Sequence, residues 1–375
     1  MKDSLLIFLP KGDTELVLRR PNFRKFAKSK DEENSEENAT VNENDNESVT
    51  TTAPIEEFQD RTSSISTTQD LRELRPSDED NRPNEVRFRV SSAHLILASP
   101  VFKAMLDGPF SEGVRNKNGL FEIKAFEWNT IAMVVLMDII HGHHRSVHPK
   151  VTLGLFTEIA MVVDYYQCHE IAETFAAKWV AAWGNEFLTG YDDTTMPRLF
   201  IGWVFGQRDL FDAMVFDILN HSTTPLKTDL PLPSTVLERL ESRRVFLISR
   251  TLENLYGLLE SLWATDDGCI MECSSMHLGL LMKAMRQYGF EVPKPKEIKT
   301  GKSFDEIHKF LQGLTTPTWY VKNKFGTIYT HDCSFKEKMK PWLNDLSKNL
   351  AQGAWWLDFQ KPKSADSDAA DTKGN

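Results

Sequence analysis

The strongest constraint on the fold of this 375-residue chain is a change of hydrophobic period within residues 86–106. Apolar and charged residues first alternate, as they do in a strand with one buried face. The spacing then becomes helical, and Ser99-Pro100 is typical of an N-cap followed by a proline in the first helical turn. We therefore expect a strand followed by two short helices, with Leu97 and Phe102 in the core.

Further strands are expected nearby in the sequence. Apolar-rich runs at Leu5–Leu9 and Glu15–Arg19 flank a Pro/Gly turn, which predicts a two-stranded hairpin. A third run, Leu120–Ile123, predicts another short strand. Short strands mixed with short helices indicate an α+β domain, which we place at residues 1–26 and 85–183.

Most of the remaining chain has helical patterns. Residues 127–141 have the 3.6-residue spacing of an amphipathic helix, and two further helices are expected at about 152–166 and 169–183. Few strand signals follow, so residues 184–360 are predicted to form a mostly α-helical C-terminal domain. Its helices are expected at 200–219, 235–263, 274–288, 304–311 and 335–350. The leucine-rich stripe of 235–263 is interpreted as a core face, with a coiled coil as the alternative.

An acidic segment interrupts the α+β domain. Between Ala27 and Glu85 there are 17 acidic and 6 basic residues, and Phe58 is the only aromatic residue. Such a composition buries too little apolar surface to offset the entropy of ordering, so 27–84 is predicted to be a disordered insert. The segment is interpreted as a spacer, with a basic partner or phosphorylation as alternatives. Residues 361–375 are predicted to be a disordered tail.

Composition excludes several classes of protein. The net charge of −10 resides almost entirely in the acidic segment, so the remaining chain has no basic excess, and direct binding to nucleic acid is not expected. Apolar runs are too short for a membrane span. Four cysteines are too few for a disulfide framework, which indicates a reducing compartment, cytoplasmic or nuclear.

The segment 86–106, VRFRVSSAHLILASPVFKAML, resembles the core of a BTB/POZ domain. The helix ending in Ile-Ile-His-Gly, at residues 139–142, is similar to a later helix of that family. The run from Gly12-Asp13 to Arg20-Pro21 resembles the opening of fungal proteins that have a single BTB domain and an uncharacterised helical C-terminal half. The resemblance implies a BTB/POZ-like fold for the α+β domain.

This resemblance implies a non-catalytic protein–protein interaction protein, an adaptor or assembly factor that binds protein partners. The partner would be a second BTB domain, giving a homo-oligomer, or a cullin. In cullin-binding members an apolar-x-Glu element follows the aromatic-containing helix, and Phe110 and Glu112 stand at the matching positions. These two residues are the predicted partner-binding residues, although Phe110 could instead fold back onto its own core.

Three alternative functions stay open. The first is a substrate adaptor of a cullin-type ubiquitin ligase, whose C-terminal half would bind the substrate. The second is a transcriptional regulator that acts through a partner. The third is an enzyme with a dispersed site, although the chain has no phosphate-binding loop, nucleophile elbow or dinucleotide fingerprint and is predicted not to be an enzyme.

The C-terminal half contains a candidate metal site. Cys269-x3-Cys273 and His331-x-Cys333 supply the thiolates and imidazole that a tetrahedral structural zinc ion prefers, and His277 is a spare ligand. The alternative is that the thiols pack as small apolar groups. No other cofactor is predicted.

Histidines in the N-terminal half form a second candidate site. His94 is interpreted as a core or turn residue because no nucleophile motif accompanies it. The histidines at 141, 143, 144 and 148 crowd one loop and could bind a transition metal, but such loops are usually incidental.

Overall fold

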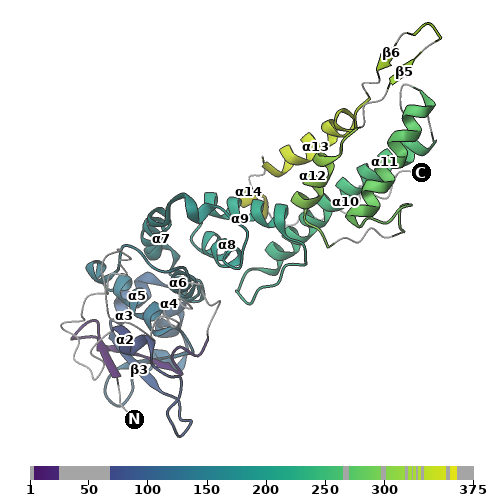
Figure 1. Cartoon of the computed structure of the whole chain (residues 1–375). Helices are drawn as coiled ribbons and strands as arrows, with labels where there is room; N and C mark the ends of the chain where they lie inside the picture. The colour runs from purple at the N-terminus through teal and green to yellow at the C-terminus, as the bar shows by residue number, and fades with distance from the viewer. Residues whose placement is uncertain are drawn as a thin grey trace, which may run out of the picture. The chain divides into compact units, whose positions relative to one another are not determined.

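Figure 1 shows a computed structural model of the chain, which forms two compact units. Unit 1 comprises residues 1–211 and 228–231, and unit 2 comprises 212–227 and 232–375. The predicted domain boundary between residues 183 and 184 stays a prediction. The residues that the structure describes are 4–24, 68–264, 270–296, 301–316, 320–322, 324–326, 328–330, 333–351 and 355–360.

Unit 1 contains a four-stranded mixed sheet of order β1-β3-β2-β4. β3 is antiparallel to β2 and parallel to β1, and β4 is parallel to β2. The interior side chains of the two central strands are fully buried, among them Leu16, Leu18 and Phe88. The strands are β1 (Ser4–Ile7), β2 (Thr14–Arg19), β3 (Glu85–Val90) and β4 (Phe121–Phe126).

The predicted hairpin of the first two strands is wrong, although both strands exist. β1 and β2 lie on opposite sides of β3 and do not pair with each other. The chain turns between them over the end of β3, where the Gly12 amide donates to the Leu9 carbonyl at 2.8 Å. A Cβ atom on Gly12 would lie 2.5 Å from the Val90 carbonyl oxygen, so only glycine allows this close crossing.

The strand-to-helix switch predicted at 86–106 is confirmed. α3 (Ser92–Ala98) and α4 (Pro100–Asp107) follow β3. The Ser99 hydroxyl caps α4 by accepting from the Phe102 amide at 2.9 Å, and it donates to the Tyr166 carbonyl at 2.5 Å. Phe102 is fully buried, as predicted, and its ring stacks on Tyr166 with centroids 4.4 Å apart.

The prediction that Leu97 belongs to the core is wrong. Its side chain is 86% exposed, and Leu95 is the buried residue of α3. α3 is short and contacts the rest of unit 1 through one narrow face, so only some of its apolar side chains are covered. An apolar residue on the surface is common in globular proteins, which is why hydrophobicity alone misplaced Leu97.

The helix predicted at 127–141 is shorter and more deeply buried than expected. α5 (Thr130–Ile140) begins at the N-cap Asn129, whose side chain accepts from the Ala132 amide at 3.0 Å. Every residue of α5 is buried, because α2, α3, α6 and α7 pack around it. The helix is therefore central to unit 1 and not amphipathic.

The predicted disordered insert is partly ordered. Residues 68–84 include α2 (Thr68–Arg72), and Leu71 is fully buried. The Asn22 side-chain amide donates to the carbonyls of Leu71 and Leu74 at 2.9 and 3.1 Å, which ties this segment to the end of β2. One buried leucine and these hydrogen bonds order a segment whose composition suggested disorder. The rest of the predicted insert, from 27 to 67, lies outside the described residues, as does the predicted tail at 361–375.

The remaining helices of unit 1 are α6 (Leu153–Tyr166), α7 (His169–Trp183), α8 (Thr195–Val204) and the first turn of α9 (Arg208–His221), with 3-10 turns at Ser111–Gly113 (η1), His144–Ser146 (η2) and Gly184–Leu188 (η3). The first two were predicted almost residue for residue. The single helix expected at 200–219 is wrong, because the chain breaks between α8 and α9. Gly206 adopts a left-handed conformation there, with φ of 61°.

Unit 2 is built mainly of helices, with the last turns of α9 at its start. Its longest helix, α10, buries most of the predicted leucine stripe, but Leu237 and Leu258 are only half-buried. A short antiparallel hairpin, which the sequence did not predict, extends beyond α11 and α13 in Figure 1. The elements are α10 (Ser234–Ala264), α11 (Met271–Tyr288), α12 (Phe304–Gly313), β5 (Tyr320–Lys322), β6 (Ile328–Thr330), α13 (Phe335–Ala351) and α14 (Trp355–Gln360).

The chain thus has a mixed architecture in which helices predominate and one small sheet lies in unit 1, in line with the predicted mixture of strands and helices. None of the helices in the described part of the chain combines the length and the apolarity needed to cross a bilayer.

Candidate protein-interaction site

The segment after α4 forms a tight loop, Gly108–Val114, which we call the 108–114 loop. The Gly108 amide donates to the Ala104 carbonyl at 3.0 Å and ends the helix. A Cβ atom on Gly108 would lie 2.1 Å from that oxygen, and one on Gly113 would lie 2.9 Å from the Leu106 carbonyl oxygen. Both glycines are therefore required for the loop to fold back so closely against α4.

The loop presents apolar side chains to solvent. Phe110 is 54% exposed and Val114 is 69% exposed. The backbone between them is a single turn of 3-10 helix, in which the amides of Gly113 and Val114 donate to the carbonyls of Phe110 and Ser111, each at 3.1 Å. The alternative in which Phe110 folds back into its own core is wrong, because more than half of its surface is accessible.

The carboxylate of Glu112 lies on the same turn. It is half-buried and accepts a hydrogen bond from the Ser111 hydroxyl at 3.0 Å. This contact is local, and it leaves the second carboxylate oxygen available for a donor on another molecule. Phe110 and Glu112 therefore occupy one rigid turn, with an apolar group beside an anionic one.

Arg115 joins the loop to the sheet. Its guanidinium donates to the Gly119 carbonyl at 2.7 Å, lies 3.3 Å from the Asp13 carboxylate, and covers the Phe121 ring at 4.1 Å from the centroid. Burial disfavours the ionised form of Asp13, but hydrogen bonds from the Ser92 amide and hydroxyl outweigh it and lower its pKa. The loop is therefore held at both ends, by glycine contacts on α4 and by an ion pair near β4.

The histidines of the loop that was predicted as a candidate metal site make contacts with neighbouring residues of unit 1. The His141 ring donates from Nδ1 to the Met137 carbonyl at 2.8 Å and accepts at Nε2 from the Ser91 amide at 3.1 Å. Burial is the main cause that lowers the pKa of His141 to about 4. His143 lies 3.2 Å from the buried Asp138, and the His144 ring packs against the edge of Phe175.

His94 and His148 also have contacts within unit 1. His94, interpreted as a core or turn residue, lies in neither place: its side chain is exposed in the first turn of α3, and its ring stacks on His141 with centroids 5.2 Å apart. The Nδ1 atom of His148 lies 2.6 Å from the Lys150 carbonyl. Within the described ranges no three His, Cys, Asp or Glu side chains gather closely enough to bind a metal ion.

Two of the four predicted zinc ligands are described. Cys273 is fully buried on α11, and Cys333 is half-buried just before α13. The other two, Cys269 and His331, lie outside the described residues. The spare ligand, His277, is 2% exposed and lies one turn after Cys273, and its Nδ1 atom is 3.5 Å from the Cys273 sulfur.

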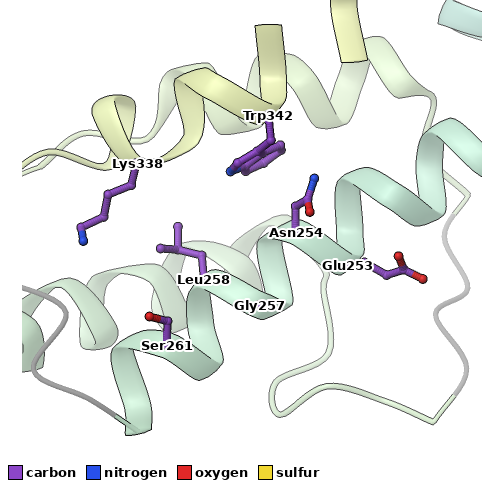
Figure 2. Close-up of a pocket in the computed structure, with 7 residues that line it drawn as sticks. All are labelled: Glu253, Asn254, Gly257, Leu258, Ser261, Lys338 and Trp342. Carbon is purple, nitrogen blue, oxygen red and sulfur yellow. The ribbon is translucent and has the colours of Figure 1, made fainter. Parts of the chain in front are cut away.

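A groove of about 480 Å³ lies in unit 2 between α10 and α13. Figure 2 shows Trp342 and Lys338 on α13 facing Asn254 and Leu258 on α10 across this groove. The groove is open and combines apolar groups with the charges of Glu253 and Lys338, which suits contact with a polypeptide segment better than enclosure of a small molecule.

The chain matches no protein-family model and no curated protein. The evidence for function therefore lies in its own residues. The exposed turn at 108–114 was anticipated at Phe110 and Glu112, whereas Val114 and Leu97 were not identified as surface residues. A sequence signal existed for the loop, since Gly-Pro and Gly residues flank an apolar residue there.

Proposed function

We propose that this chain is a non-catalytic protein–protein interaction protein, which binds a protein partner through the 108–114 loop of unit 1. The observation that carries the proposal is the 54% exposure of Phe110 on a turn that two close-packed glycines hold in place. An aromatic side chain that is more than half exposed contributes little to the stability of the free protein, but it contributes strongly when a partner covers it.

The rigidity of the loop supports this function. Binding by a disordered segment requires free energy to order the segment, whereas a preorganised turn avoids most of this cost. The hydrogen bonds of Gly108, Gly113 and Val114 and the ion pair of Arg115 fix the backbone before any partner arrives. Phe110 and Glu112 would then contact the partner without a large rearrangement.

The arrangement of unit 1 supports a BTB/POZ-like domain as the scaffold. At 85–107 a strand is followed directly by two short helices, α3 and α4. A second pair of helices, α6 and α7, follows, and Tyr166 of α6 stacks on Phe102 of α4. The edges of the described sheet are β1 and β4. An edge strand can pair with a strand from another chain, so a second copy of this domain is one partner we expect.

The second candidate function is a substrate adaptor of a cullin-type ubiquitin ligase. One observation favours it: Phe110 and Glu112 share a turn in which the ring is accessible and the carboxylate is half-buried beside it. A cullin partner would need an apolar pocket for the ring and a cationic or amide donor for Glu112. The open groove of unit 2 would be available to a substrate.

The test is a pull-down of the purified full chain with a cullin N-terminal domain, together with a measurement of self-association. Phe110→Ala and Glu112→Lys should each abolish capture of the partner. The matched control is Phe246→Ala, because Phe246 is also 54% exposed and belongs to α10 of unit 2. Capture of cullin by the wild type and by the control alone supports the adaptor function.

Other outcomes separate the candidates. If the chain captures no cullin but self-associates, and Phe110→Ala weakens the self-association, the assembly role stands and the adaptor role fails. If wild type and all variants behave alike in both measurements, the 108–114 loop is not a binding surface and the proposal is wrong.

A further inference from the structure

A second surface of unit 1 combines exposed aromatic rings with arginines, at the end of the sheet where β2 and β4 finish. Phe23 is 48% exposed, and Tyr165, in the last turn of α6, is 56% exposed. The Tyr165 ring packs on the buried Trp128 ring, with centroids 5.1 Å apart. A continuous row of side chains joins the two exposed rings, and we call it the arginine–aromatic row: Phe23, Arg20, Glu127, Arg24, Trp128 and Tyr165.

The arginines of this row lie between its aromatic rings. The Arg20 guanidinium is 3.9 Å from the centroid of the Phe23 ring and 3.3 Å from one oxygen of the Glu127 carboxylate. Arg24 is 3.2 Å from the other oxygen of that carboxylate and 5.4 Å from the centroid of the Trp128 ring. Because each member contacts the next, the row is a single surface.

The backbone that presents the row has an unusual conformation. Arg20, Asn22 and Glu127 all have φ in the left-handed region, at 52°, 56° and 67°. Residues other than glycine rarely adopt this conformation, and it persists where the surrounding structure fixes it, often at ligand-binding sites. Here the Glu127 amide donates to the Arg19 carbonyl at 2.8 Å, and the Asn22 amide donates to the Trp128 carbonyl at 3.0 Å. The arginines and the carboxylate are therefore placed together before any partner binds.

The row has an excess of positive charge. Two guanidinium groups share the Glu127 carboxylate, which is the only carboxylate within ion-pair distance of either group among the described residues. The side chains of Arg20 and Arg24 are both more exposed than that of Glu127. A guanidinium has five N–H donors and forms directional, charge-assisted hydrogen bonds with carboxylates. Donors on both arginines are therefore accessible to a carboxylate from another molecule.

We propose that the arginine–aromatic row binds an acidic peptide segment of a partner protein, in which an aromatic residue stands next to carboxylates. The carboxylates would contact the guanidiniums of Arg20 and Arg24, and the aromatic side chain would pack on Phe23 or Tyr165 at either end of the row. The positive excess selects an anionic ligand, and the exposed rings favour one that also has an apolar group. The proposal goes beyond the proposed function, because the row shares no residue with the 108–114 loop.

A single-stranded nucleic acid also combines anionic groups with aromatic ones. Such a ligand binds as a polyanion along a groove with many cations, and its affinity depends on the number of phosphates that are neutralised. The row offers two arginines and one opposing carboxylate. This charge suits a few carboxylates better than a long phosphate backbone, so an acidic peptide is the favoured ligand.

The first test uses the full-length wild type and the fluorescence anisotropy of labelled synthetic peptides. A peptide of repeated Glu-Glu-Phe units should show saturable binding, and one of Lys-Lys-Phe units should not bind. A peptide of Glu-Glu-Ser units should bind at least about tenfold more weakly, because it lacks the aromatic anchor. Raising the ionic strength from about 0.05 M to about 0.5 M should weaken binding of the Glu-Glu-Phe peptide, because the charges of the row are accessible to solvent.

Substitutions then assign the binding to the row. Arg20→Gln and Arg24→Gln should each lower the affinity for the Glu-Glu-Phe peptide at least about tenfold, since each removes a charge-assisted contact. Glu127→Gln should raise this affinity about threefold, because it removes the carboxylate that competes for the guanidiniums. Tyr165→Ala should weaken binding of the Glu-Glu-Phe peptide and leave binding of the Glu-Glu-Ser peptide unchanged.

The matched control is Arg243→Gln. Arg243 also lies over an aromatic ring, 5.9 Å from the centroid of Trp355, but it belongs to unit 2. This variant should bind the Glu-Glu-Phe peptide as the wild type does. Phe110→Ala should do the same, so failure of this proposal and failure of the proposed function are separate results. Melting temperatures identify the variants that are folded.

Several results would overturn the proposal. They are the absence of saturable binding of the Glu-Glu-Phe peptide up to about 1 mM, equal binding of the Lys-Lys-Phe peptide, and unchanged affinity in both arginine variants. If an oligothymidine displaces the labelled peptide at a lower concentration than the unlabelled peptide does, the ligand is a nucleic acid and the proposal is wrong. Self-association that both arginine substitutions abolish would instead assign the row to a second copy of the chain. If the arginine variants do not fold, the comparison of the Glu-Glu-Phe and Lys-Lys-Phe peptides on the wild type decides.

Discussion

α4 and the 108–114 loop that follows it carry similar apolar residues and use them in opposite ways. Phe102 on α4 is fully buried and stacks on Tyr166, while Phe110, eight residues later, is 54% exposed. The difference arises at Gly108, where the chain leaves the helix and turns back along its surface. Position in the fold, and not residue type, separates a residue that stabilises unit 1 from one that is available to a partner.

Buried polar side chains also differ in whether they have hydrogen-bond partners. In unit 1 the buried Asp138 and the half-buried His141 have partners within the chain, whereas in unit 2 the buried Nε2 atom of His277 has none among the described residues. Exposed apolar groups and buried unpartnered polar groups are the two departures from ordinary packing that most often mark a function. Both units contain examples of each: in unit 1 the Thr130 hydroxyl is also buried without a hydrogen-bond partner among the described residues, and in unit 2 Phe246 is 54% exposed.

The largest expected effect is that of Phe102→Ala. Truncation of a fully buried phenylalanine typically costs about 3–5 kcal/mol, a large part of the roughly 5–15 kcal/mol that stabilises a domain. We expect the variant to be largely insoluble, or to unfold at a much lower urea concentration than the wild type. A soluble variant with the wild-type unfolding midpoint would show that α4 does not depend on this side chain.

The next effect is a dependence of stability on pH that is due to His141. Its folded-state pKa of about 4 lies below the ordinary value of about 6.5, so between these values the unfolded chain binds a proton that the folded chain does not. Stability should therefore be complete above about pH 6.5 and should fall as the pH decreases toward 4. The loss should amount to about 2–3 kcal/mol for this partly accessible ring.

The measurement is the unfolding free energy across this pH range for wild type and His141→Gln. The variant lacks the titrating ring, so its stability should change less steeply between pH 6.5 and 4. His94 and His143 lie beside His141 and remain in the variant, so the difference between the two curves isolates His141. Parallel curves would contradict the assignment.

Local patterns in the sequence were sufficient for the elements that depend on local interactions. The cap at Ser99 and the bounds of α6 and α7 were predicted because hydroxyl caps and apolar spacing act within a few residues. The pairing of β1 with β3 could not be predicted in this way. Alternating residues identify a strand, but nothing in β1 itself selects its neighbour.

Burial was the harder property to predict. α5 was expected to be amphipathic because its apolar residues recur with a 3.6-residue period, yet all of its residues are buried, including Asp138 beside His143. Leu97 was expected inside and lies outside. Both errors arise because packing from several sides is a property of the whole fold.

For the candidate sites, too, the sequence identified residues but not their surroundings. Phe110 and Glu112 were identified from a short motif, and Cys273 from the spacing of thiols, but neither pattern reveals exposure or hydrogen bonding. The position of the proton on His277 is likewise not readable from the sequence, because it is set by the contact of Nδ1 with the Cys273 carbonyl.

A smaller effect is expected at Asn22, which tests whether residues 68–84 belong to the fold. Its side chain donates to the carbonyls of Leu71 and Leu74 and accepts from the Thr130 amide at 2.8 Å. Asn22→Gly keeps the left-handed backbone, with φ of 56°, and removes these bonds, so we expect a loss of about 1–2 kcal/mol.

The control is Asn81→Gly, because Asn81 has a similar φ of 59° and an exposed side chain. That variant should unfold at the wild-type midpoint in urea. Equal effects of the two substitutions would mean that the Asn22 side chain does not hold the segment in place.

The smallest effect on stability, and the sharpest test of the comparison, is expected for Phe110→Ala. Since more than half of this ring is accessible and the glycine contacts hold the turn, truncation should change the unfolding free energy by no more than about 0.5 kcal/mol. In the same variant, affinity for the partner should fall at least about tenfold, as expected for an aromatic anchor. Phe246→Ala, with equal exposure on α10 of unit 2, should change neither quantity. A loss of more than about 1 kcal/mol of stability in Phe110→Ala would mean that the ring supports the fold. Phe110 would then be a stabilising residue like Phe102, and not part of a binding surface.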